Sequence, residues 1–294
     1  TDNKLILLKT NNDYKFKPNS SGKVFNKIVF TDKIGFRVPN KNFEYTKSKS
    51  IVFYGDSVTF GNGVKEQNSF IGHLRNKYNN YNVYNISLPG YQATHHESNL
   101  IYINKFKNIK KVYYIFTLND IKELSNIKLL KIKKDDNTTN INYVDKLKKI
   151  KLFQHINFFL RNKSYLYLFI KGKSTDPSQR WFKIDKSHYE KKNLDSFEKI
   201  LIKFQKVTFE KNIDFKVILL PYEFQTRKNN CNKMNLKPQI TIQKLLKKND
   251  IIYKDFSKDF CKSKNAKDLF YKFDPMHLSK KGHKFLFNLL KNDI

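Results

Sequence analysis

Residues 51–57 read Ile-Val-Phe-Tyr-Gly-Asp-Ser, and this stretch decides the fold. Its apolar first half ends at Gly55, which is typical of a short buried strand. A serine that directly follows such a strand, as Ser57 does, stands at a strand-to-helix turn that exposes its hydroxyl and presents its backbone N–H. Because Gly-Asp-Ser is also a common turn sequence, the function must be argued from the rest of the chain.

The chain beyond this stretch alternates short apolar runs with segments that have apolar residues at helical spacing. We predict further strands at 82–87, 111–117, 214–220 and 250–256, and helices at 67–78, 92–106, 189–211, 238–248 and 279–290. Alternating strands and helices imply right-handed crossovers and a doubly wound parallel sheet. The active site of such a sheet lies at the carboxyl ends of its strands.

Two segments depart from this alternation. Residues 1–49 are polar and rich in Lys and Asn, and we predict an N-terminal extension that packs on a main domain of residues 50–294. Residues 121–188 combine a charged stretch with an aromatic one, and we interpret them as a helical insertion, a candidate cap over the site. The aromatic stretch at 152–170 could line an acyl groove, but a small core of its own is the favoured interpretation.

The composition limits the function classes. Aromatic residues make up 15% of the 294 residues, which excludes general disorder. The net charge of +32 would attract polyanions, yet only five of the 58 basic residues are Arg, the residue that nucleic-acid readers favour. Lys, Asn, Ile, Phe and Tyr all have A/T-rich codons, so genome bias explains much of the charge. We therefore expect no nucleic-acid partner.

Location and metal binding are weakly indicated. No apolar run approaches the ~18 residues of a spanning helix. The chain begins at Thr1, so we expect that an upstream segment, which could carry a membrane anchor, has been removed.

Cys231 and Cys261 form no CxxC motif, so no metal site is expected. They could form a disulfide in an oxidising compartment or remain two thiols.

Three further short segments fall at the carboxyl ends of predicted strands or just before the last helix. Gly90 follows the second strand and can present an N–H. Asn119, followed by Asp120, comes after the third strand and can donate from its amide. Asp274-Pro-Met-His277 precedes the last helix, where Ser279 is the predicted N-cap.

The spacing of Asp274 and His277 fits a catalytic pair. A carboxylate three residues before a histidine can bind one ring nitrogen and leave the other as a base. With Ser57 these residues form a Ser/Asp/His set. His283 is the competing histidine, but it lies two turns inside the last helix, where a packing or surface role is expected.

These blocks resemble those of the SGNH hydrolase superfamily, also called GDSL esterases and lipases, over residues 51–290. The family is named for four blocks that supply Ser, Gly, Asn and His. The matching residues here are Gly55-Asp56-Ser57, Gly90, Asn119-Asp120 and Asp274-x-x-His277. The segment Leu278-Ser279-x-x-Gly282-His283 that follows is also typical of the family. Two departures occur. Val58 replaces the Leu of the family name, and Thr117 stands where the family often has Gly or Asn, which makes Asn119 less secure than Ser57.

The resemblance implies a flavodoxin-like three-layer α/β/α sandwich with five parallel strands in the order 2-1-3-4-5. It implies a bacterial ester hydrolase without metal or cofactor, with Ser57, Asp274 and His277 as the triad and Ser57, Gly90 and Asn119 as the oxyanion hole. Asp56 and Asp120 are expected to support them. Neither the resemblance nor the composition indicates an oligomeric state.

The substrate and the location are expectations by analogy. Residues 32–37, Asp-Lys-Ile-Gly-Phe-Arg, are similar to a segment of secreted or membrane-anchored members that act on surface polysaccharides. We therefore expect an extracytoplasmic enzyme that removes an acetyl group from a carbohydrate, with a cytoplasmic location as the alternative. Two other functions stay open: an O-acyltransferase that uses the same site, and a basic module that binds an anionic polymer with an inactive site.

Overall fold

The computed structural model describes residues 5–8, 14–121, 160, 164, 166, 176–272 and 274–294. The chain divides into two compact units, residues 1–123 with 178–294 and residues 124–177. Every feature discussed below belongs to the first unit. Most of the predicted insertion, at 122–175, lies outside the described residues, and the predicted domain boundary at residue 50 stays a prediction.

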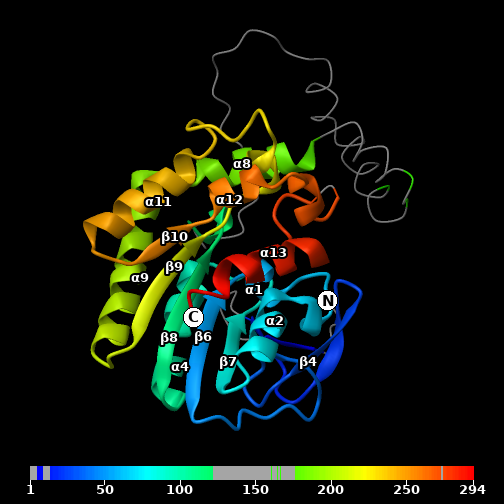
Figure 1. Ribbon diagram of the computed structural model, residues 1–294, viewed down its shortest axis with the longest axis vertical. Helices are drawn as coiled ribbons and strands as arrows, with labels where there is room; N and C mark the ends of the chain where they lie inside the picture. Colours follow the sequence, from blue (N-terminus) through cyan, green and yellow to red (C-terminus); the bar gives the residue numbers. More distant parts are fainter. Residues whose placement is uncertain are drawn as a thin grey trace. The chain divides into compact units, whose positions relative to one another are not determined.

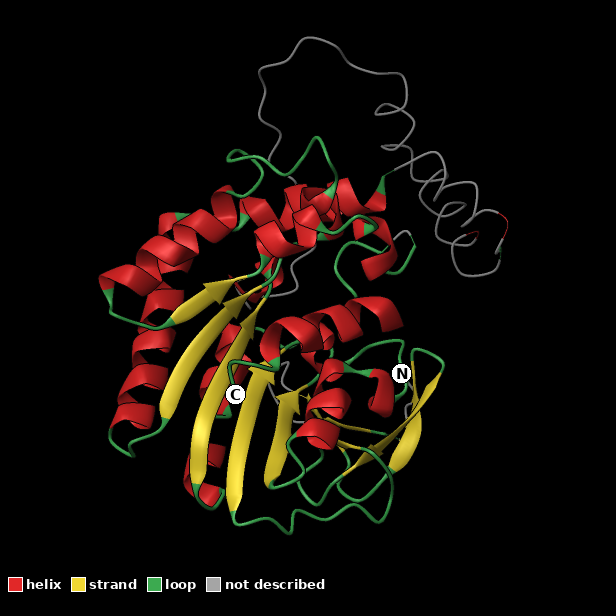
Figure 2. Ribbon diagram, in the orientation of Figure 1, coloured by secondary structure: helices red, strands yellow, loops and turns green. Residues whose placement is uncertain are grey.

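The centre of the first unit is a parallel sheet of five strands (Figures 1 and 2). The strands are β6 (Lys49–Gly55), β7 (Tyr81–Ser87), β8 (Ile109–Phe116), β9 (Asp214–Leu219) and β10 (Tyr253–Asp255). Their spatial order is β7-β6-β8-β9-β10, and all four pairings are parallel. Numbered along the chain, this is the order 2-1-3-4-5, so the predicted topology is confirmed.

Helices cover both faces of the sheet, because the central strands are apolar on both sides. On β6, Ile51 and Phe53 pack with α2 (Phe70–Lys77), α12 (Ser257–Lys262) and α13 (Lys280–Leu290). Val52 and Tyr54 point the other way and join a second core. That core includes residues of α4 (Ile101–Lys105), α9 (Lys191–Phe209) and α11 (Lys237–Lys248). The predicted three-layer sandwich is therefore confirmed.

Two elements differ from their predicted extents. The helix expected at 92–106 is two short helices, α3 (Ala93–Ser98) and α4, because the carbonyl of Asn99 turns toward the Tyr54 hydroxyl, 3.1 Å away. The strand expected at 250–256 begins only at Tyr253. Asp250 has φ +52° and the N–H of Ile251 returns to Leu246 O of α11, so these residues still end the helix.

Residues 14–49 contain more regular structure than their polar composition indicates. β3 (Ser21–Val24), β4 (Lys27–Thr31) and β5 (Arg37–Val38) form an antiparallel sheet, and β1 (Ile6–Leu8) pairs with β2 (Tyr14–Phe16). Strands of two to five residues are too short for a hydrophobic period to be visible in sequence. Phe16, Val24 and Val29 are buried in the second core, so this segment packs directly on the main sheet.

The remaining described elements are short connections. They are α1 (Ser57–Phe60), η1 (Glu66–Asn68), η2 (Leu118–Ile121), α8 (Pro177–Ser187), α10 (Glu223–Thr226) and η3 (Ala266–Leu269). Cys231 and Cys261 are joined by a disulfide, which links the segment before α11 to α12. Within the described ranges, none of the helices is both long and apolar enough to cross a membrane.

Candidate active site

Ser57 stands where β6 ends and α1 begins. Asp56 is the N-cap of α1, and its Oδ1 accepts a hydrogen bond from the N–H of Val58 at 2.8 Å. Because Ser57 is the first residue of the helix, its own N–H has no partner within the helix. Helix α1 ends after one turn at Gly61, whose φ of +83° is a left-handed conformation that glycine adopts easily. The hydroxyl of Ser57 therefore lies at the carboxyl edge of the sheet.

The structure brings Ser57, His277 and Asp274 together in one hydrogen-bonded chain. His277 Nε2 lies 2.7 Å from Ser57 Oγ, and His277 Nδ1 lies 2.7 Å from Asp274 Oδ2. The other carboxylate oxygen of Asp274 accepts from the backbone N–H groups of Met276 and His277, at 3.0 and 2.8 Å. This turn explains the three-residue spacing, since one carboxylate holds both the backbone and the ring of the histidine.

The electrostatics of the pair favour a charged histidine. Burial lowers the pKa of His277, but the hydrogen bond and negative charge of Asp274, together with the charge of Asp56, raise it above 6.5 overall. Burial raises the pKa of Asp274, and its hydrogen bonds from His277 outweigh this effect and lower the pKa below 3.8. Asp274 is therefore a carboxylate at neutral pH, and it stabilises the imidazolium that forms when His277 takes a proton.

His283, the competing histidine, lies in a different environment. It is 1% exposed, its ring stacks on Phe70, and its Nδ1 accepts from the N–H of Phe70 at 3.3 Å. Burial lowers the pKa of His283 to about 3, so the ring is neutral. His283 is thus a packing residue between α13 and α2, one of the two roles expected for it.

Asn119 lies in η2, directly after β8, and contacts Asp56. Its Nδ2 donates to Asp56 Oδ2 at 3.2 Å, and its Oδ1 accepts from the Thr117 hydroxyl at 2.7 Å. The Asp56 carboxylate therefore orients the amide. One amide hydrogen is used in this contact, and the second remains for an oxyanion. Thr117, the departure from the family pattern, fixes the amide from the opposite side.

Asp120 and Gly90 occupy the same edge of the sheet as Ser57. Asp120 Oδ2 accepts from the N–H of Thr117 at 2.9 Å. Burial, and then the charge of Asp56, raise the pKa of Asp120 well above 3.8. Gly90 follows β7 with φ +84°, a conformation that would strain other residues. The oxyanion roles of Ser57, Gly90 and Asn119 and the catalytic roles of the triad stay predictions.

Two residues near Ser57 escaped the sequence analysis. The amide Nδ2 of Asn62 lies 3.3 Å from His277 Nε2, and Asn62 is 3% exposed. Its backbone N–H donates to Ser57 O at 3.0 Å, so the loop after α1 folds back toward Ser57. An Asn in a chain so rich in Asn gives no signal in the sequence.

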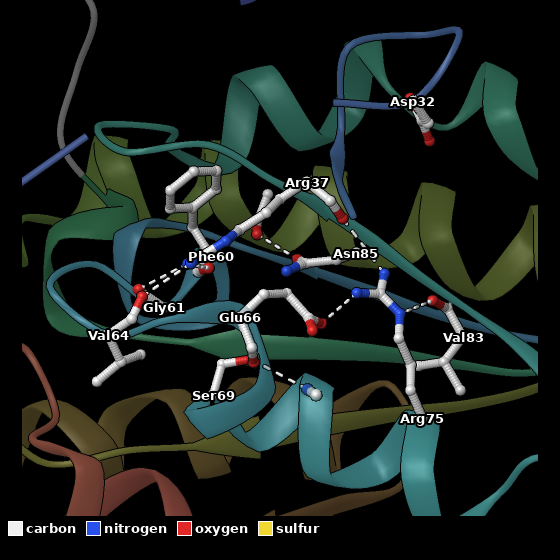
Figure 3. A network of polar contacts seen from close by, with 12 residues as sticks. Asp32, Arg37, Phe60, Gly61, Val64, Glu66, Ser69, Arg75, Val83 and Asn85 are labelled. Carbon is white, nitrogen blue, oxygen red and sulfur yellow. Dashed lines mark hydrogen bonds and ion pairs between the residues drawn. The ribbon is translucent and has the colours of Figure 1, made fainter. Parts of the chain in front are cut away.

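Arg37 is the second residue that was missed, and Figure 3 shows its surroundings. Its Nη1 donates to the carbonyls of Phe60 and Gly61, each at 2.8 Å, and its Nη2 donates to Val64 O at 2.8 Å. Arg37 therefore holds the carboxyl end of α1. A signal did exist, because an Arg is unusual in a chain whose basic residues are nearly all Lys.

Glu66 and Arg75 complete this network. Arg75 Nη1 forms an ion pair with Glu66, and its Nε donates to Val83 O at 3.0 Å (Figure 3). Burial lowers the pKa of Arg37 to about 10, against the charge of Glu66, which raises it. Arg37 thus keeps its charge at neutral pH. In the part of the chain that the structure describes, no group of three or more His, Cys, Asp or Glu could hold a metal ion.

Comparisons with known proteins agree with the fold. Neither a family model nor a curated protein sequence matches the chain. An acetyl xylan esterase of known structure is 16% identical, with a TM-score of 0.51 over 83% of this chain and 99% of that one. A member of the lipolytic G-D-S-L family from Veillonella parvula is 10% identical, with a TM-score of 0.46 over 83% and 97%. The likeness to the acetyl xylan esterase shows a shared fold, in agreement with the predicted α/β architecture.

Proposed function

We propose that this protein is a serine esterase that removes a short acyl group, acetyl, from a carbohydrate. The observation that carries the proposal is the hydrogen-bond chain from Ser57 through His277 to Asp274, with both links at 2.7 Å. A serine hydroxyl is a weak nucleophile by itself, and a base within hydrogen-bond distance that is oriented by a carboxylate is what activates it.

The reaction follows from this geometry. His277 Nε2 takes the proton of Ser57 Oγ, and Oγ attacks the carbonyl carbon of the ester. The carbonyl oxygen becomes an oxyanion, which the N–H groups of Ser57 and Gly90 and the free amide hydrogen of Asn119 would receive. His277 then gives its proton to the leaving sugar oxygen, and an acyl-enzyme remains on Ser57.

Water completes the cycle. His277 takes a proton from a water molecule, the hydroxide attacks the acyl-enzyme, and the proton returns to Ser57 Oγ as acetic acid leaves and ionises to acetate in solvent. Asp274 keeps the ring oriented in both halves, and Asp56 orients Asn119 through the contact at 3.2 Å. If a second sugar hydroxyl replaces water, the same site performs the transfer of the acyl group, which is the alternative activity.

Two observations support an extracytoplasmic location. Disulfides such as Cys231–Cys261 form in oxidising compartments. Residues 32–37, whose counterparts belong to secreted or anchored enzymes, form the turn that leads into Arg37. The choice of an acetylated carbohydrate rests on the analogy of this segment and on the shared fold with an acetyl xylan esterase.

A fluorophosphonate probe tests the proposal, because it labels only activated serines. We expect one adduct by intact mass on the wild type and none on Ser57→Ala, which should keep its melting temperature. Ser98→Ala is the matched control, since Ser98 is an exposed serine on α3 whose hydroxyl only bonds the helix backbone, and it should label like the wild type. A folded wild type that takes no adduct would contradict the proposal and favour the basic binding module.

The products then separate hydrolase from transferase. The wild type is incubated with an acetylated saccharide, with and without an excess of a free sugar acceptor. Release of acetate at the same rate in both reactions supports the hydrolase. Acetyl groups that appear on the acceptor, with little free acetate, would instead identify the O-acyltransferase.

A further inference from the structure

The turn between β3 and β4 has an unusual residue at its tip. Val24 and Lys27 are the last pair of the hairpin, so Phe25 and Asn26 form a two-residue turn. Their φ angles are +47° and +58°, both in the left-handed region. Turns of this kind favour Asn and Gly at both positions. Asn26 follows that preference, whereas a bulky aromatic such as Phe25 in this region is an outlier that carries backbone strain.

The side chain of Phe25 lies beside the catalytic histidine. The centroid of its ring is 5.9 Å from that of the His277 ring, and the two planes are inclined by 46°. The residue is nevertheless 54% exposed. Its neighbour Val24 is 1% exposed and anchored in the core, so the hairpin holds the ring in this place. A strained, exposed aromatic side chain beside a reactive group is a feature that packing does not explain.

We propose that Phe25 is a substrate-binding residue whose ring stacks on the sugar ring that carries the ester cleaved at Ser57. This inference rests on the proposed function and specifies how the carbohydrate would be recognised. The face of an aromatic ring is negative, and one face of a pyranose presents C–H groups with partial positive charge, so the two attract. At 5.9 Å from His277, the Phe25 ring can reach the sugar whose oxygen receives the proton from that histidine.

The surroundings favour a sugar over a long acyl chain. Lys23 and Asn26 are exposed on either side of Phe25, and Lys27 is half-buried next to Asn26. Ammonium and amide groups suit the hydroxyl and carboxyl groups of a saccharide. A long acyl chain would need a continuous apolar groove, and these polar neighbours interrupt the apolar surface at the tip of the hairpin.

The test compares two acetate esters, one with and one without a sugar, and one ester of a long acyl chain. The substrates are ethyl acetate, a fully acetylated methyl xyloside, and ethyl octanoate, and the variants are Phe25→Ala, Phe25→Trp and Phe25→Gly. We expect Phe25→Ala to raise KM for the xyloside about tenfold, the size of one lost aromatic contact, with kcat unchanged. Ethyl acetate kinetics should stay within about twofold, and Phe25→Trp should retain the low KM.

Stability provides a second readout. Because glycine adopts positive φ without strain, Phe25→Gly should raise the melting temperature while it loses affinity for the xyloside as Phe25→Ala does. The matched control is Ile28→Ala, which removes a 60% exposed apolar residue from the same hairpin and should leave all three substrates unaffected. A merely structural Phe25 would affect all substrates equally.

Three results would overturn the proposal. The first is a Phe25→Ala variant in which the ratio of KM for the xyloside to KM for ethyl acetate is the same as in the wild type. The second is an Ile28→Ala variant whose KM for the xyloside rises as much as that of Phe25→Ala. The third is a KM that rises for ethyl octanoate alone, which would assign Phe25 to an acyl chain. If the wild type hydrolyses none of the esters, the proposed function fails by itself. Calorimetric titration of the xyloside into Ser57→Ala, with and without Phe25→Ala, then decides the role of Phe25.

Discussion

Two polar clusters lie at opposite ends of the one-turn helix α1. At its amino end, Ser57 joins His277 and Asp274, whose side chains are 17% and 27% exposed. At its carboxyl end, Arg37, Glu66 and Arg75 are 1%, 8% and 9% exposed. The guanidinium groups of the second cluster bind protein carbonyls and the Glu66 carboxylate, whereas the first cluster ends at the hydroxyl of Ser57. One cluster holds the helix in place, and the other contains the serine to which we assign the reaction.

Removing the charge of Asp274 should give the largest effect on activity. Asp274→Asn keeps the size of the side chain but lets the ring of His277 take the wrong tautomer, so turnover should fall by ~10⁴-fold. The free energy of unfolding should change little, because the pair is partly exposed. Steady-state kinetics and urea unfolding measure both effects. Asp268→Asn, which loses an exposed ion pair with Lys281, should match the wild type.

If Asp274→Asn lowered the free energy of unfolding by as much as it raised the activation free energy of turnover, the expected separation of activity from stability would be wrong. That result would mean that the site also supports the fold, and the contrast between the two clusters would then fail. A melting temperature within a few degrees of the wild type is the expected result.

Removing the charge of Glu66 should affect stability and not the chemistry. Glu66→Gln leaves two buried guanidinium groups without their counter-charge, so the free energy of unfolding should fall by about 3–5 kcal/mol. Turnover per folded molecule should remain measurable at low temperature. Glu97→Gln breaks the more exposed pair with Lys203 and should cost less than about 1 kcal/mol. If Glu66→Gln were as stable as the wild type but its Ser57 had moved away from His277, the cluster of Arg37, Glu66 and Arg75 would instead affect catalysis by positioning Ser57.

The pH profile should show the smallest and most specific effect. Only neutral His277 can take the Ser57 proton, so kcat/KM should fall about tenfold per pH unit below the pKa of His277. That pKa is raised above 6.5, so the midpoint should lie above 6.5, and it should move down in Asp274→Asn. A profile that is flat from about pH 5 to 9 would exclude His277 as the base.

A substitution of Asn62 provides a second test of the pH profile. Its Nδ2 points at His277 Nε2, and a donor in this place favours the neutral ring. Asn62→Ala should therefore move the midpoint up, with a few-fold change in the maximal rate. A midpoint that moves down would mean that the amide oxygen faces the ring.

The sheet and the chemistry-bearing blocks were predictable for a common reason. Buried parallel strands are continuous apolar runs, and short polar blocks directly after them must meet at one edge. Ser57 and Asn119 follow this rule, whereas the Asp274–His277 pair was recognised from its three-residue spacing just before the last helix. The topology needed the family resemblance as well, because strand order is not contained in periodicity.

The contacts of Arg37, Asn62 and Phe25 were not predictable for the opposite reason, although the rarity of Arg gave a signal for Arg37 itself. Each acts through a contact with a residue far along the chain: Arg37 with Phe60, Asn62 with His277, and Phe25 also with His277. Their local sequence is that of ordinary loops and short strands. The pairing of Cys231 with Cys261 was open for a similar reason, because spacing alone does not bring two cysteines together.

The distance along the chain between Ser57 and His277 also has a consequence for biosynthesis. The two residues are 220 positions apart, although their side chains touch. At about 5–20 residues per second, the ribosome makes the serine roughly ten to forty seconds before the histidine. During that interval Ser57 is an ordinary alcohol. Under the proposed mechanism, the growing polypeptide therefore has no activated serine until the late histidine folds against the early serine.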